Sequence, residues 1–511
     1  MKVNEVSTQM PLTGSEYIES LKDGREVFIY GEKVKDVTTH PAFRNSVRSV
    51  AKLYDALHDP KYKDKLTTET DTGNGGFTQK FFRMSRSQQE LLEARDSIAE
   101  WSRMSYGYMG RSPDFKATFL GCLGDNAEFY GEFKKNADFW YKESQEKVWF
   151  FNHAIVNPPV DRNKPVHESD VFIRAVKETD QGVIVSGAKM VATGSMLTNY
   201  TFVAQFQPVQ KEENALAFFV KMDTPGLKIL SRPSYEMAAA KTGAPFDYPL
   251  SSRYDENDAI LVFDHVLIPW ENFLVYRDVE KSNTFLPQTG YVNRAMLQAS
   301  TRMGVKLDFV SGLLMKAVEA AGTNEFRGVQ AHVGEVLAWR QIFWAMSTAM
   351  VHEPNITPGG AYLPNIGIAT TARVMNSIAW PRVKEIIQQV VAGGLIVQPS
   401  SAEDFKNPDI RPYLDKFFRG SNGYDAVERN KLIKLLWDAM GSEFGSRHEL
   451  YERNYSGNHE GIRLDIYNFA AHSPLGAELK DLVHACMDDY GLDGWKGNTW
   501  VNNDDVSSKK A

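Results

Sequence analysis

Residues 180–187, Asp-Gln-Gly-Val-Ile-Val-Ser-Gly, decide the fold class of this chain of 511 residues. A turn of Asp, Gln and Gly leads directly into a β-branched run, which is typical of the second strand of a hairpin. Further apolar runs follow at 201–207, 216–220 and 260–263, with Gly, Pro and Asp between them. Their spacing predicts a compact β domain or barrel in the middle of the chain.

Both flanks of this β segment have helical periodicity. Upstream, residues 44–141 repeat apolar positions at helical spacing, and 27–34 resembles a small hairpin. Downstream, apolar helical faces run through 307–321 and 329–343, as in a bundle. We therefore expect a mainly α protein with a central β-barrel and no parallel βαβ alternation. The expected parts are an N-terminal mainly helical domain (1–148), a middle β-barrel domain (149–283), a C-terminal helical bundle (284–470) and a C-terminal tail (471–511).

The composition excludes several classes of protein. With 58 Lys+Arg against 65 Asp+Glu the formal net charge is -7, so we expect no nucleic-acid or anionic-membrane partner. The two cysteines, Cys122 and Cys486, belong to no metal-binding motif, so neither a disulfide scaffold nor a metal site is expected. No apolar stretch approaches the ~20 residues of a membrane span, and residues 1–12 lack the core of a signal peptide. These features predict a cytoplasmic protein.

The common catalytic motifs are missing, and two isolated residues are the most suggestive. There is no G-x-G-x-x-G after a strand, P-loop, H-E-x-x-H or G-x-S-x-G. His153, in Phe-Phe-Asn-His-Ala-Ile-Val-Asn-Pro-Pro, lies where helical periodicity changes to β, a place where pockets form. Arg111 lies in a loop bounded by Gly and Pro. On this context alone, a paired core histidine and a surface arginine bonded to Asp114 remain the simpler interpretations.

Several blocks of sequence, taken together, carry a family resemblance. Over nearly its whole length the chain resembles the large, oxygenase component of the 4-hydroxyphenylacetate 3-monooxygenase family. The most specific blocks are 36–43, 106–114, 152–161, 185–193, 248–272, 325–330 and 441–457. The resemblance implies an acyl-CoA dehydrogenase-like architecture, which is a helical domain, a β-barrel and a four-helix bundle in that order.

The resemblance also implies a reaction. Members of this family use FAD in its reduced form, FADH2, which a separate NAD(P)H:flavin reductase supplies. With O2 it forms a C4a-hydroperoxide, which hydroxylates a para-substituted phenol ortho to its OH and yields a catechol. A homotetramer is implied as well. The same chemistry on tyrosine, a carrier-bound tyrosyl group or a halo- or nitrophenol is an alternative, and so is an acyl-CoA dehydrogenase or dehydratase.

Site residues follow from the same resemblance. Arg111 and His153 match the catalytic positions, where a cation would stabilise phenolate charge and a neutral histidine would take the phenol proton. Substrate-binding positions are Arg111, Phe115, His153, Gln207, Pro208 and Ser456. Flavin-binding positions are His153, Ala154, Ile155, Val156, Pro159, Val160, Asp161, Arg162, Thr193, Asn454, Tyr455, Ser456 and Gly457. Phe115 departs from the Tyr of some close members, so the native phenol stays open.

Overall fold

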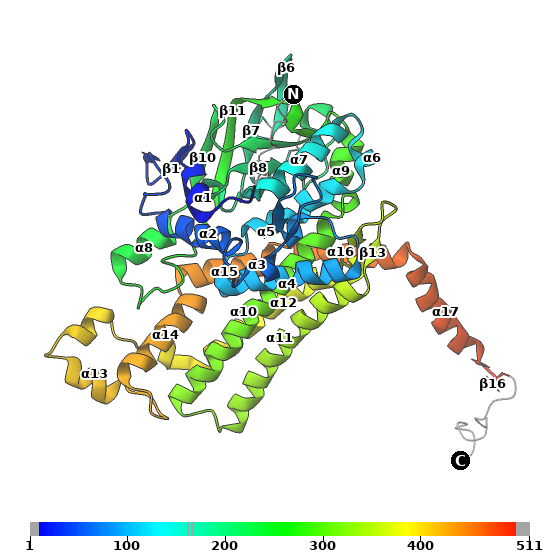
Figure 1. Ribbon diagram of the computed structural model, residues 1–511. Coiled ribbons are helices and arrows are strands. Elements are labelled where there is room, and N and C mark those ends of the chain that lie inside the picture. Colours follow the sequence, from blue (N-terminus) through cyan, green and yellow to red (C-terminus); the bar gives the residue numbers. More distant parts are fainter. Residues whose placement is uncertain (1–9, 161–162, 165–167, 169, 497–511) are drawn as a thin grey trace. The chain divides into compact units, whose positions relative to one another are not determined.

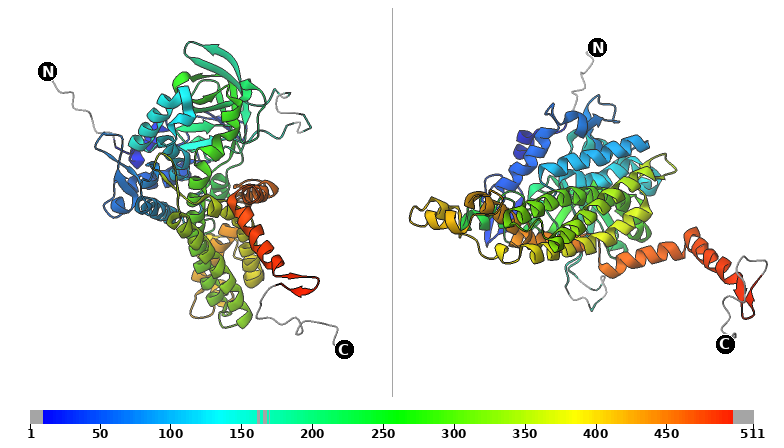
Figure 2. Two further views of the ribbon diagram at one scale, coloured as in Figure 1. Left: turned by 90° about the vertical axis from the view of Figure 1, so that its right-hand side faces the viewer. Right: turned by 90° about the horizontal axis from the view of Figure 1, so that it is seen from below.

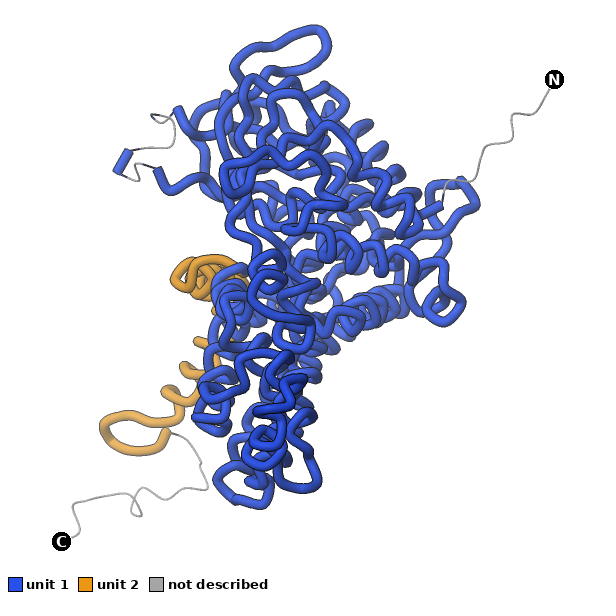
Figure 3. The backbone as a smooth tube through the Cα atoms, turned by 90° about the vertical axis from the view of Figure 1, so that its left-hand side faces the viewer, with its two compact units in different colours: residues 1–455 blue, residues 456–511 orange. Residues whose placement is uncertain are grey.

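The computed structural model describes residues 10–160, 163–164, 168 and 170–496 (Figure 1). The chain forms two compact units, Met1–Tyr455 and Ser456–Ala511 (Figure 3). Within the part of the chain that is described, none of the helices combines the length and the apolar character that crossing a membrane requires.

The N-terminal segment is mainly helical, as predicted. Its first helix begins with a capping box, in which Thr13 and Glu16 each accept a backbone hydrogen bond from the other. The predicted hairpin at 27–34 is present as β1 and β2. The elements are α1 (Gly14–Ser20), β1 (Glu26–Ile29), β2 (Glu32–Val34), α2 (Arg44–Ala56), α3 (Lys63–Leu66), β3 (Thr67–Glu69), β4 (Phe77–Gln79), α4 (Gln88–Met104), α5 (Pro113–Leu120), α6 (Ala127–Tyr130) and α7 (Lys134–Lys147).

The middle segment forms two sheets, with strand orders β2-β1-β10-β11-β7-β6 and β12-β9-β8-β5. The rings of Phe218 and Phe263 lie 6.0 Å apart, so apolar faces of the two sheets meet. Pairing among the described residues leaves two separate sheets rather than one closed ring. The strands are β5 (Phe151–Ala154), β6 (Arg174–Thr179), β7 (Gly182–Lys189), β8 (Tyr200–Val203), β9 (Leu216–Lys221), β10 (Leu227–Ser231), β11 (Ala259–Pro269) and β12 (Phe273–Tyr276), with helix α8 (Tyr235–Thr242) among them.

The turn quoted at the outset joins β6 to β7 as predicted. Gly182 has φ +157°, and a Cβ there would overlap the carbonyl oxygen of Ile268 on β11. The N-terminal hairpin joins the same sheet, because Glu26 to Phe28 of β1 pair in parallel with Lys228 to Leu230 of β10. An element expected in the first domain therefore extends the sheet of the second.

Long helices follow, and they pack as the predicted bundle. Helices α10, α11 and α12 all contact one another, and α14 packs on α10; Figure 2 shows α10 and α11 side by side. Gly322 ends α10 with φ +73°. The elements are α9 (Val279–Gln288), α10 (Tyr291–Ala321), α11 (Arg327–His352), β13 (Asn355–Ile356), β14 (Tyr362–Leu363), α12 (Ile366–Val391), α13 (Arg411–Phe417), α14 (Ala426–Met440) and α15 (Glu443–Asn454).

One hydrophobic core joins the helical, β and bundle segments. It extends from Tyr17 of α1 through Phe219 of β9 to Phe444 of α15. The proposed boundaries between the first three domains stay predictions. The second unit contains α16 (His459–Ala471), α17 (Pro474–Asp488), β15 (Tyr490–Gly491) and β16 (Gly494–Trp495).

Candidate active site

A buried carboxylate holds the loop that carries Arg111. Glu256 accepts hydrogen bonds from the backbone N–H groups of Gly110, at 2.9 Å, and Arg111, at 2.5 Å. Burial raises the pKa of Glu256 despite the opposing effect of Arg447 and of these donors. A Cβ on Gly110 would lie 2.5 Å from the phenol oxygen of Tyr451, so the loop and α15 approach too closely for another residue. Both contacts set the direction of the Arg111 side chain.

The guanidinium of Arg111 is surrounded by aromatic rings. It lies 3.9 Å from the centroid of the Phe115 ring, 5.0 Å from that of Tyr451 and 5.5 Å from that of Tyr455. The two tyrosines stack, with centroids 4.7 Å apart and planes at 9°. Arg111 is only 8% exposed, and its Nη1 has no hydrogen-bond partner among the described residues. The simpler interpretation, a surface arginine bonded to Asp114, is therefore wrong, and the Nη1 amino group remains available to an anionic ligand.

His153 reaches the same place from β5. Parallel pairing with β8 places Asn152 and His153 on opposite faces of the strand. Asn152 donates to Ser195 Oγ at 2.6 Å, whereas the half-buried His153 ring lies 5.9 Å from the ring of Phe115. Burial lowers the pKa of His153 well below its ordinary value, and the nearby Lys116 and Arg111 side chains disfavour its protonation further. The histidine is thus neutral near pH 7, as a proton acceptor must be.

Lys116 is the residue that sequence reasoning missed. Its Nζ lies 2.5 Å from His153 Nδ1, and because Nδ1 is engaged, Nε2 is the ring nitrogen that can meet a ligand. The residue follows Phe115 on α5, a helix in which all eight residues are buried. A single lysine in the apolar run Phe-Lys-Ala-Thr-Phe-Leu was the available signal, since lysine is almost never fully buried unless it is paired.

The segment predicted to bind the flavin begins on β5 and continues beyond the end of that strand. Ala154 and Ile155 are buried, whereas Val156, Pro159 and Val160 are exposed. Lys189 of β7 anchors this segment, donating to Asn157 Oδ1 at 2.7 Å and to Gln205 Oε1 at 2.8 Å. Burial lowers the pKa of Lys189 to about 7. Asp161 and Arg162 lie outside the described residues.

Thr193 is tied to α15 by a charged network. Its hydroxyl donates to Asp258 at 2.6 Å, and Asp258 accepts from Arg447 of α15 at 2.7 Å and from Arg232 at 2.9 Å. The loop after β7 is therefore held beside the helix that carries Tyr451 and ends next to Tyr455.

The remaining predicted site residues differ in burial and in hydrogen bonding. The hydroxyl of Tyr455 is buried without a partner in the described chain, whereas exposed Asn454 donates to Leu450 of its own helix. Ser456 and Gly457 belong to the second compact unit of the chain. Gln207 and Pro208 lie in an exposed loop, where Gln207 Oε1 accepts from Asn157 at 3.2 Å. Arg111, Phe115, His153 and Tyr455 are thus the predicted residues that surround one point.

Family sequence models match the chain on both sides of this site. The model described as 4-hydroxyphenylacetate 3-hydroxylase N terminal matches residues 13–275, and the corresponding C terminal model matches 282–484. The chain belongs to this family. Its members are flavin-dependent monooxygenases, so the family resemblance of the sequence is confirmed.

Similar proteins of this family are named for different substrates. The chain is 54% identical to a 4-nitrophenol 2-monooxygenase oxygenase component from Rhodococcus sp, covering 97% of this chain and 96% of the relative. It is also 54% identical to the 4-hydroxyphenylacetate 3-monooxygenase oxygenase component of Escherichia coli, covering 98% and 97%. A Streptomyces globisporus monooxygenase for a (3S)-3-amino-3-(3-chloro-4-hydroxyphenyl)propanoyl group on a peptidyl-carrier protein is 54% identical as well, covering 95% and 92%.

A solved structure supports the same fold. The oxygenase component of a 4-hydroxyphenylacetate 3-monooxygenase, in complex with FAD and 4-hydroxyphenylacetate, has a TM-score of 0.87 and 33% identity, covering 93% of this chain and 99% of that one. The predicted order of helices, β segment and bundle is confirmed.

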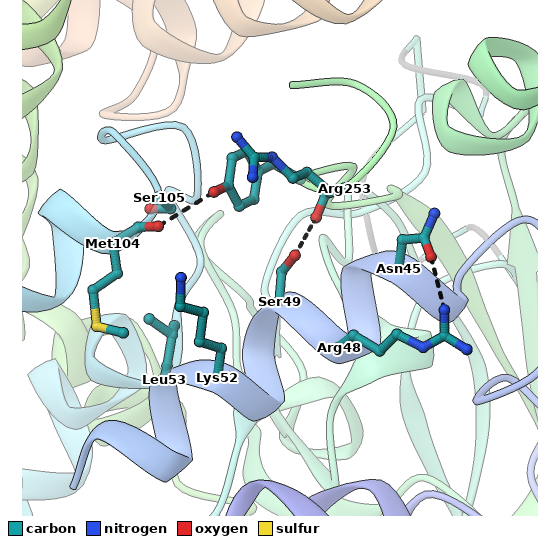
Figure 4. Close-up of a pocket in the computed structure, with 9 residues that line it drawn as sticks. Asn45, Arg48, Ser49, Lys52, Leu53, Met104, Ser105 and Arg253 are labelled. Carbon is teal, nitrogen blue, oxygen red and sulfur yellow. Dashed lines mark hydrogen bonds between the residues drawn. The ribbon is translucent and has the colours of Figure 1, made fainter. Parts of the chain in front are cut away.

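A separate pocket of about 240 Å³ is lined by residues of α2, the end of α4 and the segment at Arg253 (Figure 4). Arg48, Lys52 and Arg253 line it, and none of the predicted site residues does. Ser49 donates to the Arg253 carbonyl at 2.7 Å, and the Arg253 guanidinium lies 4.8 Å from the Tyr254 ring centroid.

Proposed function

We propose that this protein is the oxygenase component of a two-component, FADH2-dependent monooxygenase that hydroxylates a para-substituted phenol ortho to its OH, giving a catechol. The observation that carries the proposal is that buried Arg111 and neutral His153 both lie against the Phe115 ring, with the guanidinium 3.9 Å and the imidazole centroid 5.9 Å from its centroid. A fixed cation and a proton acceptor at one point are what the ionisation of a bound phenol requires.

The residues present fit FAD as the cofactor. Two buried polar atoms next to this site, Arg111 Nη1 and Tyr455 Oη, have no partner in the described chain and are available to a polar ligand. Exposed Val156, Pro159 and Val160 and the loop at Thr193 would hold the flavin, together with Tyr455. When bound in reduced form, FAD supplies with O2 the oxygen atom that is transferred.

The chain's own residues would prepare the phenol. His153 Nε2 accepts the phenol proton, because Nδ1 is occupied by Lys116 and the ring is neutral. The Arg111 guanidinium stabilises the resulting phenolate, and the phenolate ring is then more reactive toward an electrophilic oxygen. Phe115, Tyr451 and Tyr455 exclude water around that charge, which strengthens the interaction.

Sequence identity supports the reaction class more strongly than the substrate. Relatives of equal 54% identity are named for a nitrophenol, for 4-hydroxyphenylacetate and for a carrier-bound chlorohydroxyphenyl group. We infer 4-hydroxyphenylacetate as the first substrate to test, with 4-nitrophenol, tyrosine and a carrier-bound tyrosyl group as the alternatives.

We also propose a partner, an oligomeric state and a location for this protein. A reductase component supplies FADH2, the subunits form a homotetramer through their helical bundles, and the protein is cytoplasmic. Sedimentation of the purified chain would test the tetramer.

The deciding experiment combines the protein with a flavin reductase, NADH, FAD, O2 and each phenol of this panel. We expect a catechol from at least one phenol, with less H2O2 per NADH than in its absence. Peroxide without any catechol across the panel would refute the proposal. A protein that is yellow as purified and is bleached by an acyl-CoA would instead favour the dehydrogenase alternative.

A further inference from the structure

Lys116 is a buried cation-forming group without a counterion. It is 1% exposed, and in the described chain its Nζ has no carboxylate partner. The contacts of Nζ are His153 Nδ1, at 2.5 Å, and the face of the Phe115 ring, 4.1 Å from its centroid. An ammonium in such surroundings loses its hydration without an ion pair to replace it.

The charged groups around Lys116 favour its neutral amine. Burial lowers the pKa of Lys116 well below its ordinary value, the positive charge of Arg111 lowers it further, and the negative charge of Glu256 opposes this. Asp114, the other ionisable group of α5, is engaged by Ser112 and lies beside Gln298. A neutral amine has a lone pair, and the atom it faces is His153 Nδ1.

We propose that Lys116 is the final acceptor of the substrate proton, acting through His153. The proposal rests on the function proposed above. The phenol O–H bond breaks and its proton binds His153 Nε2, while the proton on Nδ1 passes to the Lys116 amine. The products are a phenolate, a neutral imidazole with its hydrogen on Nε2, and a lysine ammonium. Two protons move, the net result is transfer of one proton from the phenol to Lys116, and charge is conserved.

This arrangement explains how a histidine with such a low basicity can ionise a phenol. With Lys116 neutral, protonated His153 would be a second cation beside Arg111, whereas transfer to Lys116 moves the charge to the Nδ1 side of the imidazole. The Nε2–H group that remains donates a hydrogen bond to the phenolate oxygen. Lys116 is therefore a positioning residue with a proton-holding role, since it contacts His153 and not the phenol.

Ionisation of bound 4-nitrophenol tests the proposal without flavin, because the phenolate form absorbs visible light. In wild-type protein, a pH titration should show bound 4-nitrophenol ionising at lower pH than the free phenol. Lys116→Met should raise the apparent pKa of the bound phenol by about one unit, a tenfold change in its ionisation constant. Lys434→Met, which removes another buried lysine on α14, should leave the titration unchanged.

Amine rescue separates proton transfer from packing. Lys116→Ala should show the same raised pKa, and added ethylamine or propylamine should return it toward the wild-type value. An unchanged titration in Lys116→Met, or no response of Lys116→Ala to amines, would overturn the proposal. If Lys116→Met does not fold, Lys116→Gln provides the same comparison. Wild-type protein that forms no catechol from any phenol contradicts the proposed function, whereas normal catechol formation with an unchanged Lys116→Met titration contradicts the Lys116 role alone.

Discussion

Glu452→Gln should cause a large, pH-dependent loss of stability, because Glu452 is the anion of a buried ion cluster. Its carboxylate accepts from Arg302 Nη1 and Nη2 at 2.7 and 2.6 Å and from Lys306 Nζ at 2.9 Å. All three side chains are at most 1% exposed. The cluster joins α10 to α15, and the Arg302 guanidinium lies 5.4 Å from the ring centroid of Tyr451. It therefore supports the aromatic wall around Arg111.

Two lines of reasoning give a similar loss of folding free energy for Glu452→Gln. Burial alone would raise the pKa of Glu452, but Arg302 and Lys306 outweigh burial and lower the pKa from 4.5 to about 2. A shift of about 2.5 units corresponds to about 3 kcal/mol of folding free energy. Removing one member of a buried ion pair typically costs about 3–5 kcal/mol, because the other charge is left without a partner.

The pH dependence follows from the direction of the shift. Because the pKa in the folded protein lies below that in the unfolded chain, the stabilisation is fully present above about pH 5. It decreases as the pH falls toward the folded-state pKa, and near pH 3 about half of it remains.

Urea unfolding, followed by tryptophan fluorescence, measures the effect. Glu452→Gln should lose about 3 kcal/mol at pH 7, and the difference from wild type should be about half as large near pH 3. Glu335→Gln is the matched control, since Arg382 binds Glu335 with the same two-pronged geometry, at 2.7 and 2.8 Å, in a solvent-open position. It should change stability little. Equal losses in both variants, or a loss below about 1 kcal/mol in Glu452→Gln, would refute the role of burial.

Three further substitutions test the site. His153→Ala should raise H2O2 per NADH and lower catechol, because the proton acceptor is lost; unchanged coupling would remove His153 from the mechanism. Phe115→Tyr adds a hydroxyl to a ring whose centroid lies 3.9 Å from the Arg111 guanidinium and 4.1 Å from Lys116 Nζ, and should change the order of kcat/KM across the phenol panel; an unchanged order would mean that residue 115 only packs. Burial raises the pKa of Asp114 to about 6, so its ionisation destabilises the fold as the pH rises through about 4 to 6. Asp114→Asn should therefore gain up to about 3 kcal/mol at pH 8 and much less at pH 4, and a gain without pH dependence in urea unfolding would contradict this.

Local patterns predicted the elements of this fold well. The hairpin at 27–34, the turn before Gly182 and the two apolar helical faces were all found where residue spacing placed them. Such features depend on periodicity and on the backbone preferences of single residues, which neighbouring residues determine. The partner of a strand is different, because it depends on packing. The pairing of β1 with β10, about 200 residues away in sequence, had no local signal.

The candidate site, too, could be predicted from the sequence only in part. Arg111 and His153 could be singled out from their Gly- and Pro-bounded contexts, and the family resemblance gave them roles. Their surroundings could not be read from those contexts. The guanidinium of Arg111 is enclosed by Phe115, Tyr451 and Tyr455 and is not bonded to Asp114. Tyr451 on α15 and Tyr455 just after it lie more than 300 residues later in the chain.

The sequence by itself determined the order of helices, β segment and bundle, the family, and the residue types that the reaction needs. Only the tertiary structure decided which protons those residues can hold. Lys116 and His153 are 37 residues apart in sequence, and the packing of α5 against β5 brings Nζ to 2.5 Å from Nδ1. The protonation of both groups depends on lost hydration and on nearby charges, and those are properties of the folded interior that no spacing along the chain encodes.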